Sequence, residues 1–257
     1  TESYLWGGSY GATFDSGSDR NTISLSTMIG NSSRGFAAIT ADSNIVTQSY
    51  LRGGFYGAWL NTGADYNTIS FSTVIGSTQY GLYANASASN TVVDSYIQGS
   101  TAALVSGSTG TVIGGSVLVA TNTAGSALAF ADGSVNLTIA TSTLISPSSG
   151  RGLALNPGNV GVVSLSSVIF TGAARGIEVS TQGALFSLAV DSITFRGLSP
   201  GATAIHFLGG TFVSTFTLAD FEDAGVGANV SAAALGTNSR ITMNAYSGVR
   251  KGSVYEN

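Results

Sequence analysis

The chain has 257 residues and a hydrophobic content of 43%, which supplies a sizeable core and argues against a disordered protein. Only 9% of the residues are charged, and 13 acidic against 9 basic side chains leave a net charge of −4, so no nucleic-acid partner is expected. No apolar run reaches the roughly 18 residues of a membrane helix and cysteine is absent, so neither membrane insertion nor disulfide bonds are expected.

A short segment recurs through the first part of the chain. Asn21–Gly30 and Asn67–Gly76 share eight of ten residues at an offset of 46, and Asn44–Gly53 and Asn90–Gly99 are divergent copies at the intermediate spacing. The repeat unit is therefore about 23 residues long. Each unit alternates apolar and small polar residues between corners rich in Gly and Asn, which predicts short strands joined by turns and almost no helix.

The chain opens inside such a repeat. Thr1–Ala12 matches Thr47–Ala58 in nine of twelve residues at the same offset of 46. The end of a solenoid normally carries a cap, because it otherwise presents unpaired strand edges. We therefore expect either a part of a longer repeat chain or an open coil that a second copy completes by end-to-end self-association.

Units made only of short strands cannot bury their own apolar face, so they are expected to stack as a solenoid. We expect one β-helix domain over residues 1–257, with regular coils over 1–110, less regular and longer coils over 111–257, and about ten to eleven coils in all. The alternating apolar side chains predicted to point into its core include Ile23, Leu25, Ile69, Phe71 and Val92. This all-β arrangement resembles the right-handed parallel β-helix of pectate lyase-like proteins and of bacterial surface adhesins.

Two polar columns are expected along the corners of the regular coils, with side chains about 4.8 Å apart. Their members recur every 23 residues and are Asn21, Asn44, Asn67 and Asn90 in one column and Ser26, Ser49, Ser72 and Ser95 in the other. An amide both donates and accepts hydrogen bonds, so such a column satisfies itself. We interpret both columns as structural ladders.

Two further columns leave a choice between structure and binding. Asp19, Asp42 and Asp65 lie two residues before the Asn column and are Ca²⁺ candidates, because stacked carboxylates repel one another without a cation; capping of their own turns is the favoured role. Another column contains Tyr4, Tyr50 and Tyr96, which could stack sugars but are interpreted as filling grooves over the neighbouring coil.

The later coils offer few candidates for catalysis. The resemblance to pectin- and alginate-degrading enzymes implies clusters of Asp with Arg or Lys on one face, and those motifs are missing. The remaining candidates are Asp191, Asp220 and Asp223, whose carboxyl groups would need to lie about 5 to 9.5 Å apart for glycosidase chemistry. His206, the sole histidine, lies in an apolar run and is interpreted as structural.

The sequence thus favours a non-enzymatic extracellular or cell-surface protein, a β-helical rod that acts as a filament subunit or as the stalk of an adhesin. Repetition without a site-like break suits such a building block, and neither catalytic residues nor a cofactor are assigned to it. The alternative is a carbohydrate-active or carbohydrate-binding β-helix of the lyase, hydrolase or tailspike kind, with surface carbohydrate as its partner.

Overall fold

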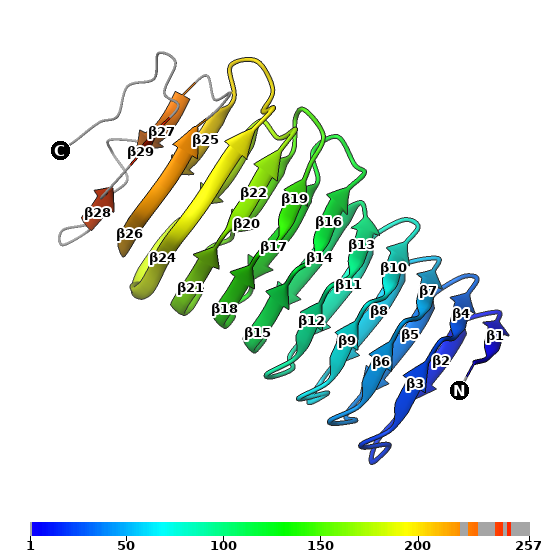
Figure 1. The fold of residues 1–257 in the computed structure, drawn as a ribbon. Helices are drawn as coiled ribbons and strands as arrows, with labels where there is room; N and C mark the ends of the chain where they lie inside the picture. Colours follow the sequence, from blue (N-terminus) through cyan, green and yellow to red (C-terminus); the bar gives the residue numbers. More distant parts are fainter. Residues whose placement is uncertain (1, 222–225, 231–239, 244–245, 248–257) are drawn as a thin grey trace.

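The computed structural model describes residues 2–221, 226–230, 240–243 and 246–247, and every element in this part of the chain is a β-strand. The strands stack in parallel along one axis, with β1 and β28 at opposite ends of the solenoid (Figure 1). The expected all-β, right-handed parallel β-helix is therefore confirmed. The described residues contain no helix with the length and apolarity that a bilayer crossing requires.

A regular coil contributes three strands, two short ones to a 19-stranded sheet, here called sheet A, and one to a 10-stranded sheet, sheet B. Sheet B contains β2 (Tyr10–Phe14), β5 (Arg34–Ile39), β8 (Tyr56–Asn61), β11 (Tyr80–Asn85), β14 (Thr101–Ser106), β17 (Ser126–Ala131), β20 (Arg151–Leu155), β23 (Arg175–Val179), β25 (Thr203–Phe207) and β27 (Val226–Val230).

Sheet A has two columns of short strands. The first column contains β3 (Thr22–Ser24), β6 (Ile45–Thr47), β9 (Thr68–Ser70), β12 (Thr91–Val93), β15 (Thr109–Gly114), β18 (Val135–Ala140) and β21 (Val160–Ser166). The second contains β1 (Tyr4–Gly7), β4 (Thr27–Gly30), β7 (Tyr50–Gly53), β10 (Thr73–Gly76), β13 (Tyr96–Gly99), β16 (Val117–Ala120), β19 (Thr143–Ile145) and β22 (Val168–Thr171). Both columns merge in the long strands β24 (Gln182–Arg196) and β26 (Gly210–Phe221), and β26 pairs with β28 (Arg240–Met243) and β29 (Tyr246–Ser247).

The register of sheet A gives the length of each coil. Asn21 lies beside Asn44, 23 residues further along the chain, whereas Ser116 lies beside Ser142, 26 residues further along. The predicted change from regular to longer coils is therefore present in the structure.

The bend between the two sheet A strands of a coil corrects part of the predicted core. Ile69 and Val92 are buried as predicted, and Ile23 packs against the core. The prediction is wrong for Leu25 and Phe71, which are 56% and 62% exposed. Their φ angles are 51° and 48°, and this left-handed conformation turns the side chain outward where strict alternation would point it inward.

The longer coils enclose larger side chains than the regular coils. Fully buried phenylalanines in the longer coils include Phe130, Phe170, Phe186, Phe195 and Phe207. The rings of Phe170 and Phe195, on successive coils, stack with centroids 5.1 Å apart. A coil with more residues has a larger circumference, so its interior needs aromatic rings to reach normal packing density.

Candidate functional site

Sheet B presents two outward-facing rows of side chains that run along the axis. The first row contains Tyr10, Arg34, Tyr56, Tyr80, Thr101, Ser126, Arg151, Arg175 and Thr203. The second row contains Thr13, Ala37, Trp59, Tyr83, Leu104, Ala129, Ala154, Glu178 and His206. The rows change from aromatic through small to charged residues, so three parts of one face have different chemistry.

Each first-row residue is followed by a glycine or an alanine, and this small residue determines which side chains of the strand face outward. At Gly57 an added Cβ would lie 2.6 Å from the Ile75 nitrogen and 2.7 Å from the Gly81 carbonyl oxygen, so the backbone leaves no room for a larger side chain. At Gly152 an added Cβ would lie 2.4 Å from the ring of Phe170. Because this position must face inward, the residue before it faces solvent.

The aromatic part lies on the coils of β5, β8 and β11. Tyr56 and Tyr80 stack with ring centroids 5.6 Å apart and an interplanar angle of 10°, and Tyr83 packs against both rings at 5.3 Å and 5.2 Å. The guanidinium carbon of Arg34 lies 3.7 Å from the centroid of the Trp59 ring, a cation–π contact that holds the indole in place. The result is a continuous aromatic platform.

A pocket of about 330 Å³ lies between the aromatic and the charged parts. Its volume falls within the range of roughly 300–1,000 Å³ that is usual for small-molecule sites. It is lined by Tyr80, Thr101, Leu104, Ala124, Ser126, Ala129, Ala131, Asp132, Arg151, Ala154 and Asn156. The hollow lies over the small side chains of Ser126, Ala129 and Ala154 on β17 and β20, because larger side chains occupy the rows on either side of them.

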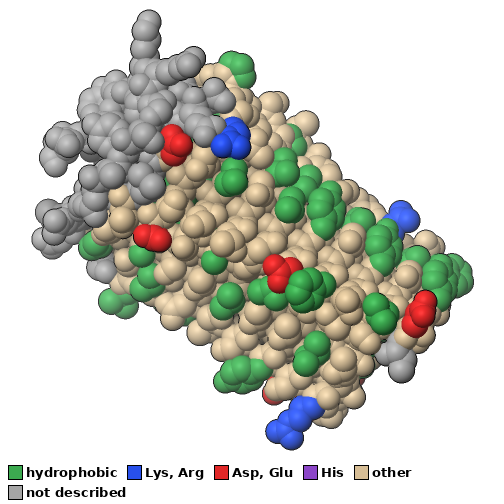
Figure 2. Space-filling model, in the orientation of Figure 1, with side chains coloured by type: hydrophobic (Ala, Val, Ile, Leu, Met, Phe, Trp, Pro, Cys, Tyr) green, Lys and Arg blue, Asp and Glu red, His purple; other side chains and the backbone are tan. Residues whose placement is uncertain are grey.

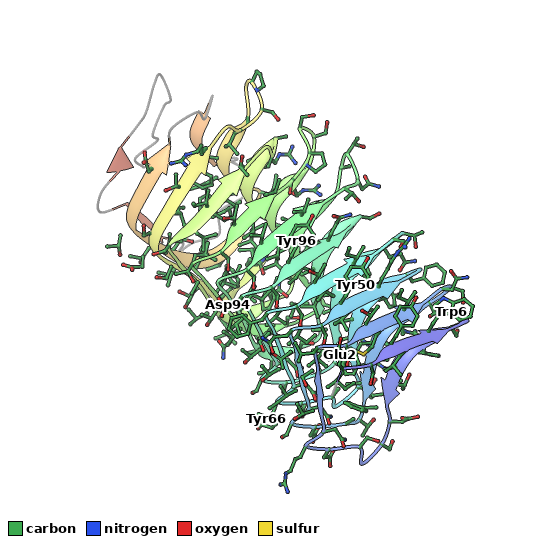
Figure 3. The ribbon with its side chains drawn as sticks, turned by 45° about the vertical axis from the view of Figure 1, so that its right-hand side comes forward. Glu2, Trp6, Tyr50, Tyr66, Asp94 and Tyr96 are labelled. Carbon is green, nitrogen blue, oxygen red and sulfur yellow. The ribbon has the colours of Figure 1, made fainter. Side chains whose placement is uncertain are left out.

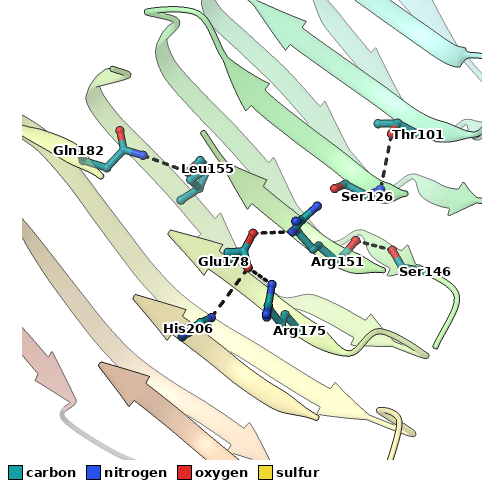
Figure 4. A network of polar contacts seen from close by, with 9 residues as sticks. All are labelled: Thr101, Ser126, Ser146, Arg151, Leu155, Arg175, Glu178, Gln182 and His206. Carbon is teal, nitrogen blue, oxygen red and sulfur yellow. Dashed lines mark hydrogen bonds and ion pairs between the residues drawn. The ribbon is translucent and has the colours of Figure 1, made fainter. Parts of the chain in front are cut away.

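The charged part is built around Glu178, which is only 5% exposed (Figure 4). Its Oε1 lies 2.5 Å from Nε of Arg151, and its Oε2 forms an ion pair with Nη1 of Arg175. Nδ1 of His206 lies 3.8 Å from the same Oε2. A buried carboxylate is stable only when it is paired, and here two guanidinium groups from adjacent coils provide the pairing.

The surroundings of the site shift the pKa of three groups. Burial, with the Arg175 guanidinium as a second cause, lowers the pKa of His206, and the nearby Glu178 opposes this shift only in part, so the imidazole is neutral near pH 7. Burial raises the pKa of Tyr80 and of Tyr83. Both phenols therefore stay protonated near pH 7 and keep their hydroxyl hydrogen as a donor.

A second groove, of about 500 Å³, lies on sheet A. It is lined by Glu2, Leu25, Ser26, Thr27, Gln48, Ser49, Tyr50, Phe71 and Thr73. Glu2 and Tyr50 mark this side of the solenoid in Figure 3. The hydroxyl groups of Ser26 and Ser49 already donate to backbone carbonyls of their own coils, at 2.8 Å and 2.7 Å. Because these hydroxyls are engaged and Glu2 is the one charged residue in the lining, whereas the pocket on sheet B has both Asp132 and Arg151, the pocket on sheet B is the stronger candidate site.

The structure does not place the predicted acidic candidates at this pocket. Asp191 lies on β24 and Asp220 on β26, both in sheet A, and Asp223 lies outside the described residues. Asp220 pairs in register with Thr194, three residues after Asp191, so the two carboxylates are not direct neighbours in the ladder.

The column of Asp19, Asp42 and Asp65 binds backbone. In each case Oδ1 accepts a hydrogen bond from an amide of the next coil, at 2.7 Å from Asp42, 2.8 Å from Asp65 and 2.6 Å from Ala88. In the described part of the chain, no group of three His, Cys, Asp or Glu side chains has the arrangement of a metal site.

The Asn and Ser columns also bond from coil to coil. Asn44 Oδ1 accepts from the Asn21 amide at 2.8 Å, Asn67 Oδ1 from the Asn44 amide at 2.9 Å, and Asn90 Oδ1 from the Asn67 amide at 2.8 Å. The same backbone-to-side-chain bond links successive serines at 3.1–3.2 Å, and this column runs through Ser26, Ser49, Ser72, Ser95, Ser116 and Ser142. The serine column therefore continues into the longer coils.

The tyrosine column lies on the second column of sheet A. Tyr4 pairs with Thr27, Thr27 with Tyr50, Tyr50 with Thr73 and Thr73 with Tyr96, so the register alternates as expected. Tyr50 and Tyr96 are half-buried (Figure 3), and Tyr50 contributes to the groove on sheet A. Tyr4 is largely exposed.

The site residues on sheet B were missed because the prediction followed the Asn repeat, which belongs to sheet A. A second repeat marks sheet B: a large or polar residue, then Gly or Ala, then an alternating apolar run. It occurs as Arg34-Gly35, Tyr56-Gly57, Tyr80-Gly81, Arg151-Gly152 and Arg175-Gly176. This pattern could have shown that Arg151 and Arg175 stack and that Glu178 and His206 share the neighbouring row.

The family model described as periplasmic copper-binding protein (NosD) matches residues 1–126, just under half of the chain. The match therefore covers the regular coils. Copper is bound by Cys, His and Met side chains. The matched segment has neither Cys nor His, and its single methionine, Met28, is fully buried, so these residues do not fit a copper site.

No curated protein sequence matches the chain, but solved structures share its fold. The tailspike protein 2 enzymatically active domain of bacteriophage CBA120 is 12% identical with a TM-score of 0.66, over 87% of this chain and 44% of that one. The tailspike gp49 of Pseudomonas phage LKA1 is 11% identical with a TM-score of 0.59, over 88% and 49%. The catalytic unit of the GH87 alpha-1,3-glucanase of Streptomyces thermodiastaticus is 12% identical with a TM-score of 0.55, over 97% and 64%. The chain thus spans less than two thirds of each of these proteins.

These findings correct the functional expectation. The interpretation as a structural rod, either a filament subunit or an adhesin stalk, is wrong. The similar structures are tailspikes and a glucanase, which favours the alternative of a carbohydrate-active or carbohydrate-binding β-helix. The interpretation as a rod also assumed that no candidate site interrupts the repeats. The outer face of sheet B, however, has a pocket between an aromatic platform and a buried ion-pair cluster. End-to-end self-association stays an untested prediction.

Proposed function

We propose that the protein binds an oligosaccharide along the outer face of sheet B, with the pocket beside Tyr80 as the central subsite. The observation that carries this proposal is the pocket of about 330 Å³ that adjoins the stacked rings of Tyr56, Tyr80 and Tyr83. A sugar ring offers apolar C–H faces and polar edges. Such a ligand matches an aromatic surface bordered by a few convergent polar groups.

The polar groups of the pocket suit sugar hydroxyls. Asp132 and Asn156 line it and provide acceptors and amide donors, and Ser126 adds a hydroxyl. Asp132 is held by a 2.5 Å hydrogen bond from the Ser106 hydroxyl, and it adopts a φ of 58° in the turn after β17. The low charge of the surface supports an uncharged or weakly charged partner. In Figure 2 most of the visible surface is neither hydrophobic nor charged.

An extended ligand fits the shape of this face better than a single sugar. Tyr56 and Arg175 lie on the same row five coils apart, a distance of about 24 Å at the usual strand spacing. The tailspike and glucanase structures with this fold support a saccharide as the ligand, although at 11–12% identity they establish the fold alone.

Binding, and not bond cleavage, is the activity that the pocket supports, because Asp132 is the one carboxyl group in its lining and glycoside hydrolysis uses a pair. Glu178 is buried in two ion pairs behind Arg151 and does not line the pocket.

We also place the protein outside the cytoplasm. The family that resembles residues 1–126 is described as periplasmic, and two of the similar structures are phage tailspikes. A binding surface for polysaccharide would find its ligands at a cell surface.

The test is binding of the purified chain to bacterial surface polysaccharide fragments and α-1,3-glucan oligosaccharides on an array, followed by titration calorimetry of the best ligand. Tyr80→Ala should weaken binding at least tenfold, because it removes the ring beside the pocket. Tyr50→Ala is the matched control, since Tyr50 is a half-buried tyrosine in the groove on sheet A. Absence of binding to any saccharide, or a loss in the Tyr50 variant alone, would refute the proposal.

A further inference from the structure

We propose that the charged end of the pocket is a subsite for an acidic sugar, whose carboxylate binds the guanidinium of Arg151. This inference rests on the proposed oligosaccharide-binding function and adds a ligand class and an orientation to it. The first observation is that the local charge at this end of the pocket is opposite in sign to the net charge of the chain. The chain has a net charge of −4, yet the cluster of Arg151, Arg175 and Glu178 has two guanidinium groups against one carboxylate and is therefore net positive.

Arg151 is the member of this cluster that reaches the pocket. It is the one basic residue in the pocket lining, and its side chain is 37% exposed, whereas Glu178 behind it is buried. The Nε of Arg151 contacts Glu178, and among the described residues no acceptor bonds to its two terminal amino groups. The two terminal amino groups of a guanidinium form a planar pair of donors, which matches the two oxygens of a carboxylate.

Arg175 makes this arrangement possible. It pairs with Oε2 of Glu178, so the positive charge of Arg175 balances the negative charge of Glu178. The positive charge of Arg151 is thus available to a ligand, while Glu178 fixes the direction of the guanidinium (Figure 4). Without Arg175, the Arg151–Glu178 pair would be neutral and would attract an anion only weakly.

The pocket lining also has one negative charge, on Asp132, which sets the orientation of the ligand. Asp132 lines the pocket and lies close enough to Tyr80 to contribute to the rise of its pKa. A carboxylate there accepts hydrogen bonds from sugar hydroxyls and repels the carboxylate of an acidic sugar. Tyr80 and Arg151 are three coils apart, or about 14 Å, so the neutral part of the ligand stacks on the aromatic platform while the acidic sugar lies at Arg151.

The experiment compares oligosaccharides that contain a uronic or sialic acid with the same oligosaccharides after reduction of the carboxyl group to an alcohol. Wild type should bind the acidic form at least tenfold more tightly at low salt, and this preference should shrink at high salt. Arg151→Gln leaves the Arg175–Glu178 pair intact, so the fold is retained while the net positive charge is lost. It should reduce the preference for the acidic form over the reduced form to less than twofold.

Two controls separate the charge from the site. Arg52→Gln removes the same charge from an exposed position on β7 and should leave the preference unchanged. Arg151→Lys keeps the charge without the planar fork and should keep part of the preference. If the Arg151→Gln variant does not fold, the lysine variant and the salt dependence of the wild type still test the subsite.

The outcomes distinguish the two proposals. If wild type binds the acidic and the reduced forms equally, the acidic subsite is refuted and the oligosaccharide-binding function stands. If a sulfated oligosaccharide binds more tightly than its carboxylated counterpart, the assignment to a carboxylate is refuted. If no saccharide binds in any form, the proposed function itself fails.

Discussion

The regular coils up to residue 110 and the longer coils after it are stabilised differently. In the regular coils the same polar side chains recur at each corner, as Asn44, Asn67 and Asn90 do, and the buried residues are mostly small aliphatic ones. In the longer coils the asparagine column stops, since Thr111 takes the position that follows Asn90, and phenylalanines fill the interior. The site lies across this boundary, with its aromatic part on regular coils and its charged part on longer ones.

This difference shows what a regular repeat permits and what it prevents. A strict repeat places identical residues side by side, which suits ladders and stacked rings such as Tyr56 and Tyr80. A cluster of unlike charges needs different residues on adjacent coils, as Arg175 and Glu178 against Arg151 show. The loss of regularity therefore provides the chemical variety of the site.

The largest effect is expected in the core of the longer coils. Phe170→Ala should lower the free energy of unfolding by about 3–5 kcal/mol, because it leaves a large cavity beside Phe195. The regular-coil counterpart Val74→Ala removes two methyl groups and should lose about 1.6 kcal/mol from transfer alone. Urea denaturation of both variants measures the difference. Equal losses would show that the two halves do not differ in how their cores are packed.

An intermediate effect is expected in the asparagine column. Asn67→Ala should lower the free energy of unfolding by about 1–3 kcal/mol, since the Asn44 amide and the Ala41 carbonyl would lose their buried partner. Asn21→Ala, at the exposed end of the column, is the control and should lose less. Hydrogen exchange should also become faster at the Asn44 amide. An unchanged rate there would show that the ladder bond does not protect this corner.

The smallest effect is expected at the bend of sheet A. Phe71→Asn should change the free energy of unfolding by less than about 0.5 kcal/mol, because the side chain is exposed and Asn tolerates the left-handed conformation. Ile69→Asn, two residues earlier and buried, is the control and should destabilise the protein strongly. Thermal melts of both variants provide the measurement. A large loss for Phe71→Asn would mean that the exposed ring is covered in solution.

The prediction from sequence succeeded where one local pattern repeats and failed where two patterns had to be combined. Ile69 and Val92 were placed in the core correctly because alternation holds within a strand. Leu25 and Phe71 were placed incorrectly because one residue at positive φ interrupts the alternation. The pocket was not predicted, since its lining comes from four coils whose relative register depends on coil lengths of 21 to 26 residues.

The amino-acid sequence by itself determined the stacking of this protein. Apolar alternation, the spacing of 23 residues and the corner asparagines are local or nearest-neighbour features, and parallel pairing of successive coils is their consequence. Only the tertiary structure decided which outward-facing residues meet. Arg151, Glu178 and Arg175 become one cluster because backbone hydrogen bonds hold β20 and β23 in register, and the hollow beside them exists because alanines on two adjacent coils coincide.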